Sequence, residues 1–212
     1  MRSEATSLFD VQRWTFDVGR SSFKTNRLPL EIHDFNKIIN SVTLMGIHTA
    51  YVAAGSNIGN KLLNCKNGIN ALTKANKTVL KNWSKFYKTD PVHYKDQDWF
   101  VNCVVKIETL LDPFELFHEL KSIERDTGRV YTPIRFGPRT LDLDIILYDD
   151  LVENSADLII PHPRMHNRRF VLQPICDINP EIVHPVLKKN MKYLLDILDK
   201  NEQRIIEYSC DY

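Results

Sequence analysis

The segment from Leu141 to Ile145 constrains the chain most, because leucine and aspartate alternate along it before an isoleucine. A period of two is that of a β-strand, in which successive side chains point to opposite faces. The run that follows, through Tyr148, is apolar, so the strand is predicted to enter a core. Asp142 and Asp144 then share one face, about 6 to 7 Å apart along the strand. Two carboxylates converge on one place.

Two like charges on one face of a strand repel each other and call for a compensating cation. A divalent metal is the strongest candidate, because Mg²⁺ prefers oxygen ligands and takes one or two carboxylates together with phosphate oxygens. Arg135 and Arg139 lie just upstream, on either side of a Gly-Pro turn, and their guanidinium groups fit phosphate. This combination is typical of phosphoryl transfer. The alternative is a structural cluster, in which the aspartates pair with these arginines at a solvated strand end.

The composition excludes several classes of protein. The chain has 212 residues, of which 43% are hydrophobic, and this is enough for one well-filled domain with appendages. A net charge of +1 argues against binding nucleic acid or a membrane surface mainly by electrostatic attraction. No apolar run reaches the roughly 18 residues of a membrane helix, and no secretory signal opens the chain. We therefore expect a cytoplasmic protein.

The cysteines and the N-terminal segment are assigned no chemistry. The 4 cysteines are scattered without C-x-x-C spacing, which indicates buried free thiols and neither a zinc site nor a redox motif. Residues 1–46 mix arginines with acidic residues and are too acidic for a typical transit peptide. We expect a poorly ordered extension there, with Met45 as a hypothetical alternative start, followed by one domain over residues 47–212.

The predicted elements alternate in the order β-α-β-β-α-β. Strands are expected at residues 47–54, 79–87, 100–108 and 141–148, and the first helix at 60–75. The second helix begins after Asp112, which is followed by a proline and a glutamate in capping positions, and it ends at Gly128. Its expected core face is Phe114, Phe117, Leu120 and Ile123. Helical segments near Leu172 and at 191–198 follow, with Pro174 and Pro180 interrupting the tail. This order predicts a ferredoxin-like α/β (α+β) sandwich, an antiparallel sheet with helices packed on one face, plus a C-terminal helical extension.

Two short signals concern a ligand. The first strand runs into Gly55-Ser56-Asn57, and a glycine there allows the backbone to approach a ligand closely. On the 100–108 strand, Phe100 and Asn102 lie on one side, where an aromatic plane and an amide suit a flat, nitrogen-rich heterocycle. Ordinary sheet packing with an incidental asparagine is the alternative. The chain contains neither a Walker-type loop nor a Rossmann fingerprint.

Read together, these segments resemble the 6-hydroxymethyl-7,8-dihydropterin pyrophosphokinase family of folate biosynthesis. The resemblance spans about residues 47–200 and rests on the ordered motifs G-S-N, F-Y-K-T-D-P, D-Q-D-W-F-V-N, I-E-R-D-T-G-R, R-F-G-P-R-T-L-D-L-D, P-H-P and N-R-R-F. It implies transfer of pyrophosphate from ATP to the hydroxymethyl oxygen of the pterin, with release of AMP. It also implies that Asp142 and Asp144 hold two Mg²⁺ ions that bridge the triphosphate.

The same resemblance assigns residues to the substrates. It places the pterin between Phe100 and Phe170, and the residues implied to bind it are Gly55, Thr89, Pro91, Val92, Phe100, Asn102 and Phe170. The residues implied to bind ATP are Glu124, Arg129, Arg135, Arg139, His162 and Arg168, with Arg135 on a loop that closes over the nucleotide. The implied catalytic residues are Arg129, Arg139, Asp142 and Asp144.

Three other interpretations stay open. A binding module of the same fold, such as an RNA-recognition or regulatory domain, would require aromatic strand motifs and a basic face that the sequence lacks. A catalytically silent pterin-binding relative should have lost the aspartates. A nucleotidyltransferase with an Asp-x-Asp pair would release pyrophosphate instead of AMP. The expected partners are ATP and the pterin, with neighbouring folate-pathway enzymes as further candidates, and no nucleic acid or membrane; the chain is expected to be a monomer.

Overall fold

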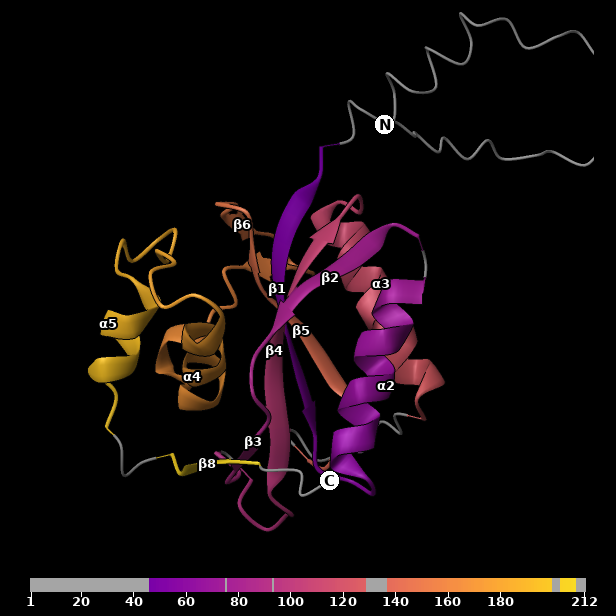
Figure 1. The fold of residues 1–212 in the computed structure, drawn as a ribbon, viewed down its shortest axis with the longest axis vertical. Helices are drawn as coiled ribbons and strands as arrows, with labels where there is room; N and C mark the ends of the chain where they lie inside the picture. The colour runs from indigo at the N-terminus through magenta and orange to yellow at the C-terminus, as the bar shows by residue number, and fades with distance from the viewer. Residues whose placement is uncertain (1–45, 75, 93, 129–136, 200–202, 209–212) are drawn as a thin grey trace, which may run out of the picture. The chain divides into compact units, whose positions relative to one another are not determined.

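The structure is a computed structural model that describes residues 46–74, 76–92, 94–128, 137–199 and 203–208. Within them an antiparallel sheet of six strands has the order β5-β1-β4-β3-β8, and β2 also pairs with β4 (Figure 1). The strands of this sheet are β1 (His48–Ser56), β2 (Thr78–Trp83), β3 (Tyr87–Thr89), β4 (Phe100–Thr109), β5 (Asp142–Tyr148) and β8 (Ile205–Glu207). The other elements are α2 (Lys61–Lys74), α3 (Pro113–Asp126), α4 (Arg169–Ile178), α5 (Met191–Asp196), the 3-10 helix η1 (Met165–Asn167), and a small sheet of β6 (Glu153–Asn154) and β7 (Ile159–Ile160).

The element order confirms the predicted ferredoxin-like α/β sandwich. Strand β1 pairs antiparallel with β4 on one side and with β5 on the other. In this register Gly55 lies opposite Asn102 of β4 and opposite Asp142 of β5. The pairing therefore brings the predicted heterocycle site and the predicted metal site to the same end of the sheet.

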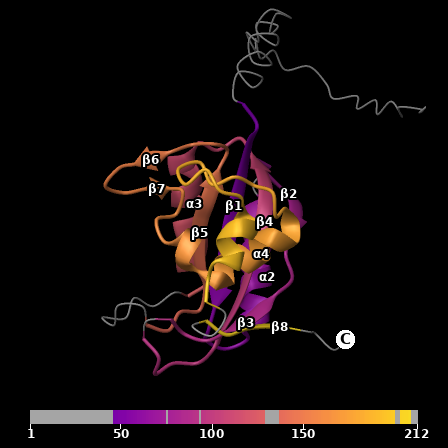
Figure 2. The ribbon, with the colours of Figure 1, turned by 90° about the vertical axis from the view of Figure 1, so that its left-hand side faces the viewer.

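Helices cover both faces of the sheet, whereas the sequence predicted helices on one face. Helices α2 and α3 pack on one face, and α4 and α5 lie over the other (Figures 1 and 2). The strands β1, β4 and β5 therefore bury side chains on both sides. The largest fully buried side chains are Leu72, Ile107, Leu116, Leu120, Leu141, Leu143, Ile146, Leu147, Ile160, Met165, Leu172 and Ile175.

Helix α3 starts as predicted and buries most of the predicted face. The carboxylate of Asp112 accepts hydrogen bonds from the N–H groups of residues 114 and 115, and Glu115 completes the capping box. Phe114, expected in the core, is 39% exposed, whereas Leu116 and Glu124 are fully buried. Leu120 and Ile123 are buried as predicted, and the buried stripe consists of residues 116, 120, 123 and 124.

Two other elements differ from expectation. The single strand expected at 79–87 is divided into β2 and β3, because Ser84 between them is held by Val104: the Ser84 N–H donates to the Val104 carbonyl, and the Ser84 hydroxyl accepts from the Val104 N–H. Pro174, expected to interrupt the tail, lies inside α4 and is buried. Burial of the apolar proline ring compensates there for the backbone hydrogen bond that a proline cannot donate.

The remaining expectations concern thiols and membranes. Cys65 and Cys103 are buried free thiols, as predicted, and burial raises the pKa of Cys65 to about 12, so it stays protonated. Cys176 is half-buried, and Cys210 lies outside the described residues.

Residues 1–45 also lie outside the described residues, so the predicted extension stays a prediction. Among the described helices, none has the length and apolar character needed to cross a bilayer.

Gly68 marks a close approach of α2 to the residue before β5. A Cβ atom at this position would lie 2.6 Å from Cδ2 of Leu141, which is fully buried. We expect Gly68→Ala to lower the free energy of unfolding by about 1–3 kcal/mol through overpacking, more than the gain in helix propensity of up to about 1 kcal/mol. Chemical denaturation measures the change. Asn67→Ala, on the exposed face of the same helix, should cost nothing, and a Gly68→Ala variant as stable as the parent chain would contradict the argument.

Candidate active site

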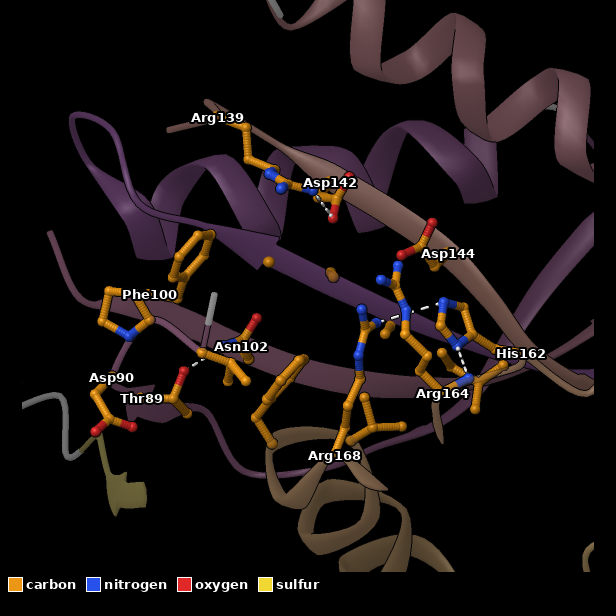
Figure 3. Close-up of a pocket in the computed structure, with 18 of the residues that line it drawn as sticks. Thr89, Asp90, Phe100, Asn102, Arg139, Asp142, Asp144, His162, Arg164 and Arg168 are labelled. Atoms are coloured by element: carbon orange, nitrogen blue, oxygen red, sulfur yellow. Dashed lines mark hydrogen bonds and ion pairs between the residues drawn. The ribbon is translucent and has the colours of Figure 1, made fainter. Parts of the chain in front are cut away.

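A cavity of about 300 Å³ lies between the sheet and the segment that leads into α4 (Figure 3). Its walls come from the end of β1, the loop after β3, the starts of β4 and β5, and residues 162–171. Most of the residues predicted from sequence line it, namely Gly55, Thr89, Pro91, Val92, Phe100, Asn102, Arg139, Asp142, Asp144, His162, Arg168 and Phe170. Arg129 and Arg135 lie outside the described residues.

One end of the cavity combines an amide with aromatic rings. The Asn102 amide donates to the hydroxyl of Thr89, which is 3% exposed, at 2.7 Å. A Cβ atom on Gly55, the residue opposite Asn102 in the sheet, would collide with the Asn102 side-chain oxygen. The amide is thus held between a backbone without a side chain and a buried hydroxyl. Phe100 and Phe170 line this end as well, and together these groups offer a flat ligand apolar faces and a polar edge.

The other end contains the two aspartates of β5, which point into the cavity (Figure 3). Arg139 donates to the Asp142 carboxylate at 2.6 Å, and the Lys121 ammonium lies 3.5 Å from the Asp144 carboxylate. Burial, followed by the charge of Asp144, raises the pKa of Asp142 despite the opposing effect of Arg139 and Lys121. Burial and the neighbouring Asp144 charge therefore both disfavour the ionised form of Asp142.

Asp144 differs from Asp142 in its charge environment. Burial is the largest influence and alone would raise its pKa, but Lys121, His162 and Arg168 together outweigh burial and lower it. Asp144 is therefore firmly ionised at neutral pH. Two carboxylates of one pair with oppositely shifted pKa values mark a functional site more often than a solvated strand end.

The carboxylate pair suits a magnesium ion, which does not need a complete set of protein ligands. Within the described ranges of the chain, no three side chains of metal-ligating type converge. Asp142 and Asp144 provide hard oxygen ligands side by side, and burial together with the charge of Asp144 raises the pKa of Asp142. Mg²⁺ commonly uses one or two carboxylates and completes its shell with water and phosphate oxygens.

A basic wall faces the aspartates across the cavity, made by His162, Arg164 and Arg168 (Figure 3). The His162 Nδ1 atom accepts from the Arg164 backbone N–H at 3.2 Å, and its Nε2 atom lies 3.4 Å from the guanidinium of Arg168. Burial, together with the charges of Arg168 and Arg164, lowers the pKa of His162 to about 4 against the opposing effect of Asp144. The ring is therefore neutral at pH 7.

Glu124, which the resemblance assigned to ATP binding, makes structural contacts among the described residues. It lies outside the described lining of the cavity and is fully buried. Its carboxylate accepts from the Leu143 N–H and from the Lys121 ammonium, both at 2.7 Å. Because Leu143 stands between the two aspartates, Glu124 fixes the backbone that carries them. These contacts give Glu124 a structural role, and its assignment to ATP binding stays a prediction.

Sequence reasoning missed several lining residues, among them Lys121, Arg164, Asp90 and Gln97. The signal for Lys121 was present: Glu124 falls on the apolar stripe of its helix, and a carboxylate there requires a buried partner, which Lys121 supplies one turn earlier. Asp90 and Gln97 lie on an irregular loop, and no periodic pattern places loop side chains. Their positions follow from contacts between segments far apart in the chain.

Comparison with known proteins agrees with this geometry. A family model described as 7,8-dihydro-6-hydroxymethylpterin-pyrophosphokinase matches residues 51–180. A 2-amino-4-hydroxy-6-hydroxymethyldihydropteridine pyrophosphokinase of Haemophilus influenzae is 43% identical over 65% of this chain and 85% of its own length. A folic acid synthesis protein of Dictyostelium discoideum is 41% identical over 78% of this chain, which spans only 25% of that protein's length.

Solved structures show the same fold. A crystal structure of Plasmodium falciparum HPPK-DHPS with pterin and p-hydroxybenzoate matches 71% of this chain and 44% of its own, with a TM-score of 0.58. At 16% sequence identity this likeness concerns the fold alone. The family match covers more than half of the sequence, and the Haemophilus relative is matched along most of its length. The chain therefore belongs to the 7,8-dihydro-6-hydroxymethylpterin-pyrophosphokinase family.

Proposed function

We propose that the chain transfers pyrophosphate from ATP to the hydroxymethyl group of 6-hydroxymethyl-7,8-dihydropterin, giving the pterin diphosphate and AMP. The observation that carries this proposal is a single cavity with an amide and two phenylalanines at one end and a carboxylate pair beneath a basic wall at the other. An aromatic heterocycle suits the first end and a polyphosphate the second. The family membership of the chain supports the same reaction.

The pterin would occupy the end formed by β1, β3 and β4. Phe100 and Phe170 would stack on its ring, and Asn102 would read its polar edge with an amide that Thr89 already orients. Such buried polar groups discriminate strongly, because an analogue lacking the matching group leaves them without a hydrogen bond. Gly55, Pro91 and Val92 complete the wall without filling the space.

Asp142 and Asp144 would hold Mg²⁺, two ions in this proposal, which when bound neutralise the triphosphate and stabilise the charge that develops during transfer. Arg139 would exchange its bond with Asp142 for one with phosphate. Lys121, fixed by Glu124 and the Leu143 carbonyl, stays beside Asp144 as a permanent cation. Arg129 and Arg135 remain predicted ATP contacts from the sequence alone.

His162 and Arg168 are suited to bind one anionic oxygen together. Because Nδ1 of the neutral His162 ring accepts from the Arg164 N–H, the ring hydrogen lies on Nε2. This places an N–H donor 3.4 Å from a guanidinium nitrogen, and two adjacent donors repel each other slightly. A phosphate oxygen between them would accept from both. The low pKa of His162 keeps this arrangement unchanged across the physiological pH range.

Product analysis tests the proposed reaction. The protein is mixed with ATP, Mg²⁺ and 6-hydroxymethyl-7,8-dihydropterin, and the nucleotides and pterins are resolved by chromatography. Pterin-dependent AMP together with a diphosphorylated pterin is the expected result. Free pyrophosphate would indicate a nucleotidyltransferase, ADP an ordinary kinase, and pterin binding without turnover a silent binding relative; each of these outcomes contradicts the proposal.

Gly55→Ala is expected to weaken pterin binding selectively. The new methyl group would displace the Asn102 side-chain oxygen and disturb its bond with Thr89. We expect the KM for the pterin to rise by about one to two orders of magnitude, the size associated with losing one well-placed buried polar contact, with the KM for ATP within about twofold. Asn102→Ala should reproduce this pattern. Equal losses for both substrates would contradict the position assigned to the pterin.

The partners and surroundings of the chain are a separate proposal. The chain corresponds to only 25% and 21% of the lengths of two relatives named as folic acid synthesis proteins, from Dictyostelium and from Schizosaccharomyces pombe. We therefore propose other enzymes of folate synthesis as its neighbours. The cytoplasmic location and the monomeric state remain predictions from the sequence.

A further inference from the structure

Strand β8 brings two residues to the rim of the cavity that the proposed reaction does not use. It pairs antiparallel with β3, so that Ile205 lies opposite Thr89. The two residues before it, Gln203 and Arg204, reach two separate segments that line the cavity. Both lie outside the described lining of the cavity, so neither is placed to touch a ligand directly.

Arg204 holds the loop that follows β3. Its backbone N–H and its side-chain Nε donate to the two carboxylate oxygens of Asp90, at 3.0 and 3.3 Å, and the Asp90 N–H donates back to the Arg204 carbonyl at 3.3 Å. Its guanidinium also lies 4.8 Å from the ring centre of Trp99. Asp90 begins the loop and Trp99 ends it, so Arg204 contacts both ends of the wall that contains Pro91.

Gln203 holds a second wall of the cavity, at the start of α4. Its side-chain oxygen accepts from the Arg169 N–H, and its side-chain nitrogen donates to the Asn167 carbonyl, both at 2.8 Å. Helix α4 begins at Arg169, and its N-cap is Arg168, whose side chain has no acceptor to offer. Gln203 therefore supplies the capping bond from another segment. The residues on either side of Arg169 are Arg168 and Phe170, which both line the cavity.

We propose that Gln203 and Arg204 form a clasp that sets the separation of the two cavity walls, and that both act as positioning residues for pterin recognition. Two adjacent residues contact the two walls: Arg204 contacts Trp99, which precedes Phe100, and Gln203 contacts Arg169, which precedes Phe170. A flat ring stacked between Phe100 and Phe170 is sensitive to the spacing of these two rings, because stacking contact is lost steeply with distance. The identity of the ligand rests on the proposed function, whereas the clasp itself rests on the contacts of β8.

Kinetics of variants test the clasp. Arg204 is an exposed residue, with 66% of its side chain accessible, so Arg204→Ala should fold. We expect it to raise the KM for the pterin about three- to tenfold, the range expected for losing an ion pair and a cation–π contact, with kcat and the KM for ATP changed by less than about twofold. Arg204→Lys keeps a charge for Asp90 but loses the planar group over Trp99. Its KM for the pterin should therefore lie between that of the parent protein and that of Arg204→Ala.

Glu207→Gln is the matched control. Glu207 lies on the same strand and forms an exposed ion pair with Lys85 at 2.7 Å, away from the cavity. If β8 contributes only general stability, this variant should affect the KM for the pterin as much as Arg204→Ala does. An equal effect, or no rise in the KM for the pterin in Arg204→Ala, would overturn the proposal.

Hydrogen exchange provides a readout that does not depend on the reaction. In the unliganded protein we expect Arg204→Ala to speed amide exchange in residues 90–99, Gln203→Ala to speed it in residues 167–172, and Glu207→Gln to change neither segment. Unchanged exchange in the first two variants would refute the clasp. If the parent protein produced no AMP but these exchange changes occurred, the proposed function would fail while the clasp stood.

Discussion

Replacing Asp144 by asparagine is expected to lower kcat by on the order of a hundred- to a thousandfold, the loss typical of removing one electrostatic contact at a reacting centre. Asparagine keeps the size of the side chain but removes the charge that a magnesium ion would bind. Asp142→Asn should have an effect of the same order. Steady-state kinetics over a range of Mg²⁺ concentrations, with Mg²⁺ binding measured separately by calorimetry, tests both variants. Asp196→Asn, which alters an exposed pair with Lys192, is the control.

Stability separates the metal site from the alternative of a structural ion-pair cluster. The pKa of Asp142 is raised in the folded protein, so at neutral pH its ionised form opposes folding, and Asp142→Asn should leave the chain as stable as the parent or more stable. The pKa of Asp144 is lowered, so its charge favours folding above its unfolded pKa, and this contribution is lost as the pH falls through the folded value.

The two variants should therefore lose activity together but differ in stability. A structural cluster predicts a different result. Both variants would lose stability because both aspartates pair with basic residues, and activity would fall only because the protein unfolds. Chemical denaturation at pH 7, measured beside the kinetics, distinguishes the two cases. Retention of parent-like turnover in either variant would refute the metal assignment. Sites that sacrifice stability for function are common where like charges are held together.

The strand that carries these aspartates was predictable because its signal is local. Alternation along residues 141–145 fixes both the strand and the face of each side chain, and the capping residues around Asp112 fix the start of α3 in the same way. The division of the strand expected at 79–87 was not predictable, because it depends on hydrogen bonds between Ser84 and Val104, which are distant in sequence. Local sequence patterns determine where strands and helices form, whereas contacts between distant segments determine where a strand is interrupted.

The site shows the same division. Residues in continuous motifs, such as Asp142, Asp144 and Asn102, line the cavity that the motifs implied. The position of Lys121 depends on how α3 is rotated against the sheet, and the exposed Phe114 shows that the predicted apolar face was only partly right. The clasp residues Gln203 and Arg204 follow from the pairing of β8 with β3, which no local pattern encodes. Motifs therefore predicted the ligand contacts, and the structure was needed for the residues that hold them in place.

Replacing Glu124 by leucine is expected to lower the free energy of unfolding by about 2 to 3 kcal/mol, the upper part of the range for a buried donor left without its acceptor. The Leu143 N–H would lose its acceptor, and Lys121 would lose its nearest carboxylate. Glu124→Gln keeps an acceptor for Leu143 and removes only the charge, so it should cost about 1 kcal/mol. Chemical denaturation measures both, with Asp126→Asn on the exposed end of α3 as the control.

A second substitution shows whether the cost arises from the buried pair. If the loss in Glu124→Leu comes partly from the Lys121 charge left behind, adding Lys121→Met should recover part of it, because a buried pair replaced by apolar groups costs less than one broken on a single side. A nucleotide contact predicts otherwise: Glu124→Gln would raise the KM for ATP and leave stability unchanged. The buried position between α3 and β5 instead predicts that stability falls first, and that activity falls with it because Leu143 joins Asp142 to Asp144.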